Sequence, residues 1–268
     1  MGGSLLAPSH REFLRDLAAT RLLLAFDYDG VLAPLGPELH GRALPPRTRR
    51  LLGRLARRYP VAVISGRGWR DLRGFVREPG VILVGNHGAE LGRPEPVPRA
   101  VQAAIRDWTR ELAERLAGVP GWHFELKRST FSIHYGLAPG RRSVEQAVRR
   151  AGSALRGVRL IHGKNVLNVI PAGFPGKGDA VIALLRRGRL DTALFLGDDV
   201  TDEDAFAVGA PRVVGVKVGP GPTVAPWRIR RQEQVDELLE RLVELRPPRA
   251  PRRTAPARAR RHQGRRRP

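Results

Sequence analysis

Two carboxylates separated by a single residue stand directly after an apolar segment near the start of the chain. The segment Leu22–Phe26 is predicted to be a buried parallel strand, and Asp27 and Asp29 follow it in the motif DYDGV. Open α/β sheets place their chemistry at the carboxyl ends of such strands. Strand alternation would point the two carboxylates to opposite faces, but Gly30 lets the chain turn so that the second swings back over the first. One carboxylate can then attack while the other transfers a proton, and both can help to hold a divalent cation; a plain Asp- and Gly-rich turn is the alternative.

A second group of acids follows another apolar segment late in the chain. Thr192–Leu196 is predicted to be a strand, and the motif GDDVTDEDAF, residues 197–206, comes directly after it at an apparent helix start. The motif holds more carboxylates than N-capping requires. The repulsion among these carboxylates would be costly unless a cation were bound. Hard oxygen ligands in this number suit Mg²⁺.

Two smaller signals add groups that bind phosphate. Val61–Ile64 is a third strand candidate and ends in the sequence SGR, residues 65–67, whose hydroxyl and backbone amides suit a phosphoryl oxygen. Lys177 lies between glycines just before the helical pattern Ala180–Arg187. The alternatives are an ordinary turn for the first and a solvated surface lysine for the second.

These motifs together resemble a known group of enzymes. DYDGV, SGR, GKGDA and GDDVTDEDAF stand in the order found in the haloacid dehalogenase superfamily of phosphatases, and the resemblance spans about residues 20–245. With GNHGAEL, Gly85–Leu91, the chain is more closely similar to trehalose-6-phosphate phosphatases and their sugar-phosphate phosphatase relatives. The resemblance implies a Rossmann-like core, a mobile cap and one Mg²⁺ as cofactor.

The resemblance also implies a role for each motif residue. Asp27 would be the nucleophile that forms an aspartyl-phosphate, and Asp29 the general acid that later serves as the base for water. Ser65 and Lys177 would hold the phosphoryl oxygens. Lys177 and Mg²⁺ would offset the repulsion between an anionic carboxylate and a phosphate dianion, and the pKa of the second carboxylate is expected to be raised by the first. The implied metal ligands are Asp27, Asp29, Asp198 and Asp202.

The cap of this family supplies residues that recognise the sugar. Glu125 and Lys127 match the first of its three stretches, whereas His134-Tyr135-Gly136 lacks the Arg of the second. The third stretch has Asn168 and Ile170 where a carboxylate and a basic residue are typical. An amide accepts fewer sugar hydroxyls than a carboxylate does. The predicted substrate contacts are Gly66, Arg67, His87, Glu125, Lys127, Lys164 and Asn168, although His87 could equally be a hydrogen-bonded structural histidine.

The fold class predicted from the element order is α/β. Strands alternate with helices up to the linker marked by Pro94, Pro96 and Pro98, a pattern typical of a doubly wound parallel sheet. A helix, two strands, a helix and two strands follow. We therefore expect a Rossmann-like parallel core, residues 1–93 and 172–245, interrupted by an inserted α+β cap with the order αββαββ, residues 94–171.

Composition limits the cellular setting. The 268-residue chain has no cysteine, which excludes disulfides and thiolate chemistry. No apolar run approaches the length of a membrane span, and Met1–Arg21 is charged and lacks the apolar region of a signal peptide. These features predict a cytoplasmic protein without a membrane partner.

The formal net charge is +22, and part of it is concentrated at the C-terminus. Residues 246–268 hold ten arginines and no acid, and they are rich in Pro and Ala. This composition predicts a disordered tail. Its attraction to nucleic acid would be nonspecific and salt-sensitive, and a compositional bias toward Arg is the favoured explanation.

The function implied by the resemblance is a Mg²⁺-dependent phosphatase that hydrolyses trehalose 6-phosphate to trehalose and phosphate. Two alternatives stay open. The substrate could be another glycosyl phosphate, such as a glucosyl- or mannosyl-phosphoglycerate or a polyol phosphate. The chain could instead be a non-catalytic sugar-phosphate sensor with a polyanion-binding tail, although the presence of both Asp27 and Asp29 argues against this.

Overall fold

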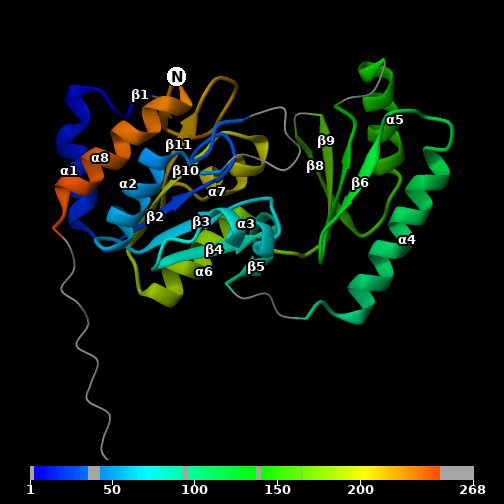
Figure 1. Cartoon of the computed structure of the whole chain (residues 1–268), viewed down its shortest axis with the longest axis horizontal. Coiled ribbons are helices and arrows are strands. Elements are labelled where there is room, and N and C mark those ends of the chain that lie inside the picture. Colours follow the sequence, from blue (N-terminus) through cyan, green and yellow to red (C-terminus); the bar gives the residue numbers. More distant parts are fainter. Residues whose placement is uncertain (1–2, 36–42, 93–95, 137–139, 164, 248–268) are drawn as a thin grey trace, which may run out of the picture.

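The protein contains two β-sheets of different kinds (Figure 1). The computed structural model describes residues 3–35, 43–92, 96–136, 140–163 and 165–247. Strands of the larger sheet are parallel, except that the last pair is antiparallel. In spatial order they are β1 (Gly3–Ser4), β12 (Trp227–Ile229), β11 (Val213–Val218), β10 (Thr192–Gly197), β2 (Leu22–Phe26), β3 (Val61–Ile64), β4 (Val81–Gly85) and β5 (Glu90–Leu91).

Helices cover both faces of the larger sheet. In β2, Leu22, Leu24 and Phe26 enter one apolar core, while Leu23 and Ala25 enter the other. The first core is shared with α1 (Arg11–Ala19), α2 (Pro46–Ala56), α3 (Trp69–Phe75) and α8 (Val235–Leu245), and the second with α6 (Lys177–Gly188) and α7 (Glu203–Val208). A strand buried on both faces must be apolar throughout, which explains the uninterrupted run in β2. The predicted doubly wound parallel core is confirmed.

The smaller sheet is antiparallel and stands beside the core. Its spatial order is β6 (His123–Leu126), β7 (Phe131–His134), β9 (Val166–Pro171) and β8 (Val158–Gly163). The helices α4 (Arg99–Arg115) and α5 (Arg141–Ser153) lie on its far side, so the sheet stands between its own helices and the core (Figure 1). The chain order α4-β6-β7-α5-β8-β9 is the αββαββ order that the sequence predicts.

The strand β7 of the smaller sheet has one apolar and one polar face. Phe131 and Ile133 of β7 are buried against α4 and α5. Ser132 lies on the opposite face, where it pairs in register with Asn168 of β9. Alternation along a strand therefore directs a row of polar side chains toward the larger sheet.

The sheet topology brings distant motifs to one edge. Phe26 of β2 pairs with Leu196 of β10 on one side and with Val63 of β3 on the other. The three parallel strands therefore end side by side, and the residues after them meet. Gly30 has a φ of +77° just past β2, and a β-carbon there would collide with the carboxylate of Asp198. Only glycine satisfies both constraints at this position.

Several features differ from the sequence prediction. The short strands β1, β5 and β12 were not expected, and β5 runs antiparallel to β4. None of the helices in the described segments is both long and apolar enough to cross a membrane.

The expected tail begins with a residue that is docked on the core, so this part of the prediction is wrong. The guanidinium of Arg246 donates to the backbone carbonyls of Ala18 and Thr20. It also lies 4.3 Å from the centroid of the Tyr59 ring. Residues 248–268, the remainder of the expected tail, lie outside the described residues.

We predict that Arg246→Ala lowers the free energy of unfolding by about 1–2 kcal/mol, because it removes hydrogen bonds to two carbonyls and a cation–π contact. Chemical denaturation of the full chain measures this. The matched control is Arg50→Ala on the exposed side of α2, which should change stability by less than about 0.5 kcal/mol. Equal stability of the two variants would contradict the docking of Arg246.

Candidate active site

A cavity of about 240 Å³ lies where the polar face of the smaller sheet meets the carboxyl edge of the larger one. It collects residues from all the motifs singled out in the sequence. The lining residues that were predicted as site residues are Asp27, Asp29, Ser65, Gly66, Arg67, His87, Glu125, Lys127, Asn168, Lys177 and Asp198. Of the other two predicted residues, Asp202 is fully buried directly behind Asp27 and Lys177, and Lys164 lies outside the described residues.

A buried lysine joins the two acidic motifs. Lys177 is the first residue of α6, and its Nζ lies 3.0 Å from Oδ2 of Asp27 and 2.7 Å from Oδ1 of Asp202. The side chain of Lys177 is 1% exposed. Burial alone would lower the pKa of Lys177, but the two carboxylates raise it above its ordinary value. The ammonium therefore stays charged and neutralises a pair of acids that could not otherwise be buried together.

Three carboxylates are close enough to share a cation. Asp27, Asp198 and Asp202 each offer an oxygen, and these atoms lie within 4.8 Å of one another. Burial raises the pKa of Asp27 well above its usual range despite the opposing charge of Lys177, and burial together with Asp202 raises the pKa of Asp198 to about 7. Three hard oxygen donors fit Mg²⁺, and a bound dication would favour the charged forms of Asp27 and Asp198.

Asp202 also organises the backbone of this acidic segment. Its Oδ2 accepts the backbone N–H groups of Asp198 and Asp199, each at 2.9 Å. On the neighbouring strand β11, the buried Lys217 donates to the backbone carbonyl of Asp198. Lys217 was not predicted from the sequence, because it follows an apolar run with no motif around it. Asp198 is thus held from both sides with its carboxylate directed into the cavity.

The second carboxylate of DYDGV does turn back into the same cavity as the first. Asp29 is paired with Arg67, whose Nε and Nη2 lie 2.7 Å from Oδ2 and Oδ1. The guanidinium is packed over the rings of Tyr28 and Phe75, with centroid distances of 5.8 and 5.3 Å. Arg67 was predicted as a substrate contact, and in this structure it fixes the position of Asp29.

His87 lines the cavity with a left-handed backbone conformation and a buried imidazole. It has a φ of +57° and is 6% exposed, and neither ring nitrogen has a hydrogen-bond partner among the described residues. Burial, together with the charges of Lys127 and Lys177, lowers its pKa well below the usual range. A neutral, buried imidazole that lines a cavity in this way is better suited to bind a ligand than to stabilise the fold.

The smaller sheet contributes a charged cluster opposite the acids. His134 is hydrogen-bonded to Glu125 at 2.8 Å, and this bond is the main cause that lowers the pKa of Glu125 to about 2. Lys127 donates from Nζ to the carbonyl of Gly66 at 2.9 Å and lies 3.7 Å from Glu125. Glu125 is consequently an ionised acceptor and Lys127 a donor on the same wall.

Asn168 and Ile170 differ in what they can contact. Oδ1 of Asn168 accepts the hydroxyl of Ser132 at 2.8 Å, while the side chain lines the cavity. Ile170 is fully buried and is not part of the lining. Of the two departures from the family pattern in β9, the one at Asn168 therefore bears directly on the site.

Some lining residues were not predicted from the sequence. They are Leu35, Ser132, His134, Val166 and Thr201, whereas Asp199, which also lines the cavity, was expected near the metal as an alternative to Asp202. Ser132 and His134 could have been found, because they alternate with Phe131 and Ile133 in a strand that is otherwise apolar. Leu35 carries no chemical signal, and only the fold places it at the cavity.

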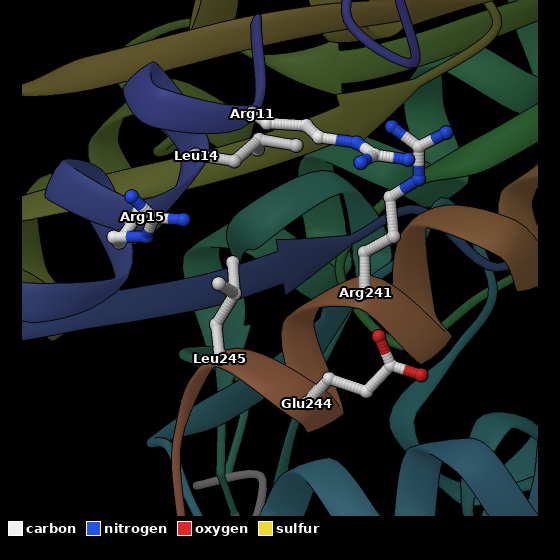
Figure 2. Close-up of a pocket in the computed structure, with 6 residues that line it drawn as sticks. All are labelled: Arg11, Leu14, Arg15, Arg241, Glu244 and Leu245. Atoms are coloured by element: carbon white, nitrogen blue, oxygen red, sulfur yellow. The ribbon is translucent and has the colours of Figure 1, made fainter. Parts of the chain in front are cut away.

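A second cavity, of about 330 Å³, lies between α1 and α8 (Figure 2). It is lined by Arg11, Leu14, Arg15, Arg241, Glu244 and Leu245. In Figure 2 the guanidinium groups of Arg11 and Arg241 extend toward one another. This lining has one carboxylate and neither a hydroxyl nor paired acids. The candidate active site is therefore the cavity of about 240 Å³, although it is the smaller of the two.

The fold and the arrangement of the cavity are those of the haloacid dehalogenase superfamily. The trehalose-phosphatase family model matches residues 25–228. The chain belongs to the trehalose-phosphatase family, as the sequence resemblance predicted.

Curated relatives cover most of the chain. It is 36% identical over 241 residues to a bifunctional trehalose-6-phosphate synthase/phosphatase of Thermoproteus tenax, and 31% identical over 244 residues to a trehalose-phosphate phosphatase of Mycobacterium tuberculosis. These matches cover 86% and 85% of the chain, but only 32% and 62% of the relatives' own lengths.

Solved structures share the fold. The C-terminal domain of Candida albicans trehalose-6-phosphate phosphatase superposes with a TM-score of 0.75 at 24% identity, covering 91% of this chain and 98% of that one. Aspergillus fumigatus trehalose-6-phosphate phosphatase gives a TM-score of 0.62 at 26% identity, covering 91% and 100%.

The raised pKa of Asp198 leads to a prediction about pH. Because its pKa rises from 3.8 in the unfolded chain to about 7 in the metal-free fold, the folded protein holds an extra proton between these values and loses stability as pH rises through them. We predict that in EDTA Asp198→Asn is more stable than the wild type at pH 8, and that the difference narrows toward pH 4. Melting temperatures across this pH range measure the effect.

The control for this experiment is Asp16→Asn on the exposed side of α1, which should show no such dependence. A wild-type protein that stays more stable than Asp198→Asn at pH 8 without metal would contradict the repulsion described above. Added Mg²⁺ should stabilise the wild type and have a smaller effect on Asp198→Asn.

Proposed function

We propose that this protein hydrolyses trehalose 6-phosphate to trehalose and phosphate through an aspartyl-phosphate on Asp27. One observation carries the proposal: a buried Asp27 stands 3.0 Å from the ammonium of Lys177 and shares its cavity with a second, separately held carboxylate. An ordinary surface turn rich in Asp and Gly would leave the carboxylate of Asp27 in solvent and would not place a buried lysine beside it.

In the first step, a carboxylate oxygen of Asp27 attacks phosphorus and the bond to the sugar oxygen breaks. Lys177 and the hydroxyl of Ser65 lie beside Asp27 in the cavity, where they can bind the phosphoryl oxygens. Phosphoryl transfer depends mainly on such positioning and charge neutralisation. Asp29 donates the proton that the departing sugar oxygen requires.

In the second step, Asp29 accepts a proton from water as the water attacks the aspartyl-phosphate. Phosphate then leaves and Asp27 is restored. Arg67 holds Asp29 at one wall of the cavity. Asp29 enters the first step with a proton on one oxygen while Arg67 stays bonded to the other, and the carboxylate left after proton donation then serves as the base.

A divalent cation, Mg²⁺ in this proposal, fits the oxygens of Asp27 and Asp198, with Asp202 and the backbone carbonyl of Asp29 as further candidates. Bound there, it would neutralise charge on the nucleophile and the phosphoryl group. Asp27 and Asp198 line the cavity whereas Asp202 lies behind them, which favours Asp27 and Asp198 as the principal ligands.

The polar wall of the smaller sheet is proposed to bind the sugar as a cap. Glu125 and Lys127 face the acids across the cavity and provide an ionised acceptor and a donor for hydroxyls. His87 has both ring nitrogens available for a substrate oxygen. The names of the relatives point to trehalose 6-phosphate as the substrate, and a cytoplasmic location remains part of the proposal.

A different glycosyl phosphate is the second candidate substrate. Asn168 stands where the family pattern has a carboxylate, and its oxygen is already engaged by Ser132. A sugar with fewer donor hydroxyls at that position would suit this wall better.

A non-catalytic sensor is a weaker candidate. A protein described as a trehalose synthase regulatory protein from Candida albicans shares the fold with a TM-score of 0.67, so fold alone does not decide between catalysis and regulation. The paired Asp27 and Asp29 in one cavity favour catalysis.

The test is phosphate release from a panel of sugar phosphates that includes trehalose 6-phosphate. Asp27→Asn should lower kcat by at least about a thousandfold, and Asp29→Asn by about a hundredfold or more, while Asp16→Asn retains full activity. EDTA should stop the reaction and Mg²⁺ restore it. Substantial turnover by Asp27→Asn would refute the mechanism, and a clear preference for another sugar phosphate would select the second candidate.

A further inference from the structure

The turn between β6 and β7 is inserted into the core. We call residues 127–130 the hairpin tip; the backbone N–H of Lys127 donates to the carbonyl of Thr130 at 3.0 Å and closes the turn. The rest of the smaller sheet extends away from this point toward α4 and α5 (Figure 1).

One core side chain binds two hydroxyls of the hairpin tip. Nδ2 of Asn86 donates to Oγ of Ser129 at 2.6 Å, and Oδ1 of Asn86 accepts the hydroxyl of Thr130. The exposed fractions of Asn86, Ser129 and Thr130 are 0%, 4% and 1%. Since none of these groups can turn to water instead, losing one partner would leave the others buried and unsatisfied.

The backbone of Asn86 connects this contact to the candidate active site. Its N–H donates to the carbonyl of Arg67 at 2.7 Å, and the N–H of the next residue, His87, donates to the carbonyl of Ser65 at 2.9 Å. Asn86 has a φ of +54°, a conformation that asparagine tolerates better than most residues. Asparagine is also a side chain that offers both a donor and an acceptor to two hydroxyls.

The other contacts of the hairpin tip lie beside the same core segments. Lys127 reaches the carbonyl of Gly66, and Nε of Arg128 lies 3.9 Å from Oε1 of the buried Glu90. Glu125 precedes the tip by two residues on β6. The contacts that hold the hairpin tip on the core therefore set the positions of Glu125 and Lys127 relative to the acids of the core.

We propose that Asn86 is a positioning residue that fixes the smaller sheet to the core through Ser129 and Thr130, and thereby sets the affinity of the site for the sugar part of its substrate. Asn86 touches neither the reacting atoms nor the cavity. The kinetic part of this inference rests on the proposed phosphatase function, whereas the structural part does not.

Matched substitutions in the full chain test the proposal. Asn86→Gly keeps the left-handed backbone and removes the side chain; Thr130→Val keeps the shape and removes the hydroxyl; Thr130→Ser keeps the hydroxyl. We expect Asn86→Gly and Thr130→Val to raise KM by about tenfold, the loss that corresponds to buried hydrogen bonds, with kcat within about threefold. Thr130→Ser should restore most of the wild-type KM. Ser153→Ala, which removes an exposed hydroxyl from α5, is the control.

Hydrogen exchange gives a readout that does not require turnover. In Asn86→Gly and Thr130→Val, the amides of Phe131–His134 should exchange about tenfold faster, while those of Leu22–Phe26 stay unchanged. Faster exchange in both segments would indicate global destabilisation and overturn a local positioning role. The double variant should be no worse than the more impaired single variant, because both changes remove the same contact.

Two results separate this inference from the proposed function. If KM and exchange of the single variants stay within twofold of the wild type, Asn86 does not position the smaller sheet, although the phosphatase assignment survives. If the wild type releases phosphate from no sugar phosphate, the function fails and the positioning claim for the substrate fails with it, while exchange at Phe131–His134 still decides whether Asn86 fixes the sheet.

Discussion

The interaction on which the site depends is the buried contact of Lys177 with Asp27 and Asp202. Removing one partner from a buried charge pair typically costs about 3–5 kcal/mol, since an uncompensated charge is left behind. Here the ammonium sits at the start of α6 and reaches acids that follow two neighbouring strands. The close approach of β2, β10 and α6 is therefore both a result of apolar packing and a condition for burying these charges. Asp202 also accepts the backbone amides of Asp198 and Asp199, and Lys217 donates to the carbonyl of Asp198, so the same group of contacts holds the segment that carries Asp198.

The smaller sheet separates stability from recognition by using its two faces differently. Phe131 and Ile133 belong to the apolar core with α4 and α5, whereas Ser132 and His134 line the cavity. Changes on the polar face can alter which ligand is bound without disturbing the packing behind it. The departure at Asn168 lies on this polar face, whereas Ile170, two residues further along the same face, is fully buried outside the cavity.

Local sequence determines the central strands, and tertiary contacts determine much of the rest. Leu22–Phe26, Val61–Ile64 and Thr192–Leu196 were predicted because strands buried on both faces are apolar throughout. The short strands β1, β5 and β12 span too few residues for any periodicity to show. Helix α6 begins at Lys177 rather than at Ala180, and the glycines on either side of Lys177 gave no helical signal there. The acids at strand ends were predictable from position alone. The pairing of Arg67 with Asp29, of His134 with Glu125, and of Arg246 with the carbonyls after α1 was not, since each joins residues whose spacing carries no pattern.

The pairing of β2 with β10 also governs the order in which the chain can fold. β2 is made early in synthesis, yet its partner β10 follows the whole smaller sheet, and the register joins Leu22 to Thr192. Until β10 emerges, one edge of β2 exposes unpaired backbone groups, the kind of edge that invites aggregation. The smaller sheet, whose contacts are closer in sequence, can form in the meantime. Closing the β2–β10 pair is a highly non-local event that slows folding, so the segment that carries Asp27 is completed only after the smaller sheet has been made.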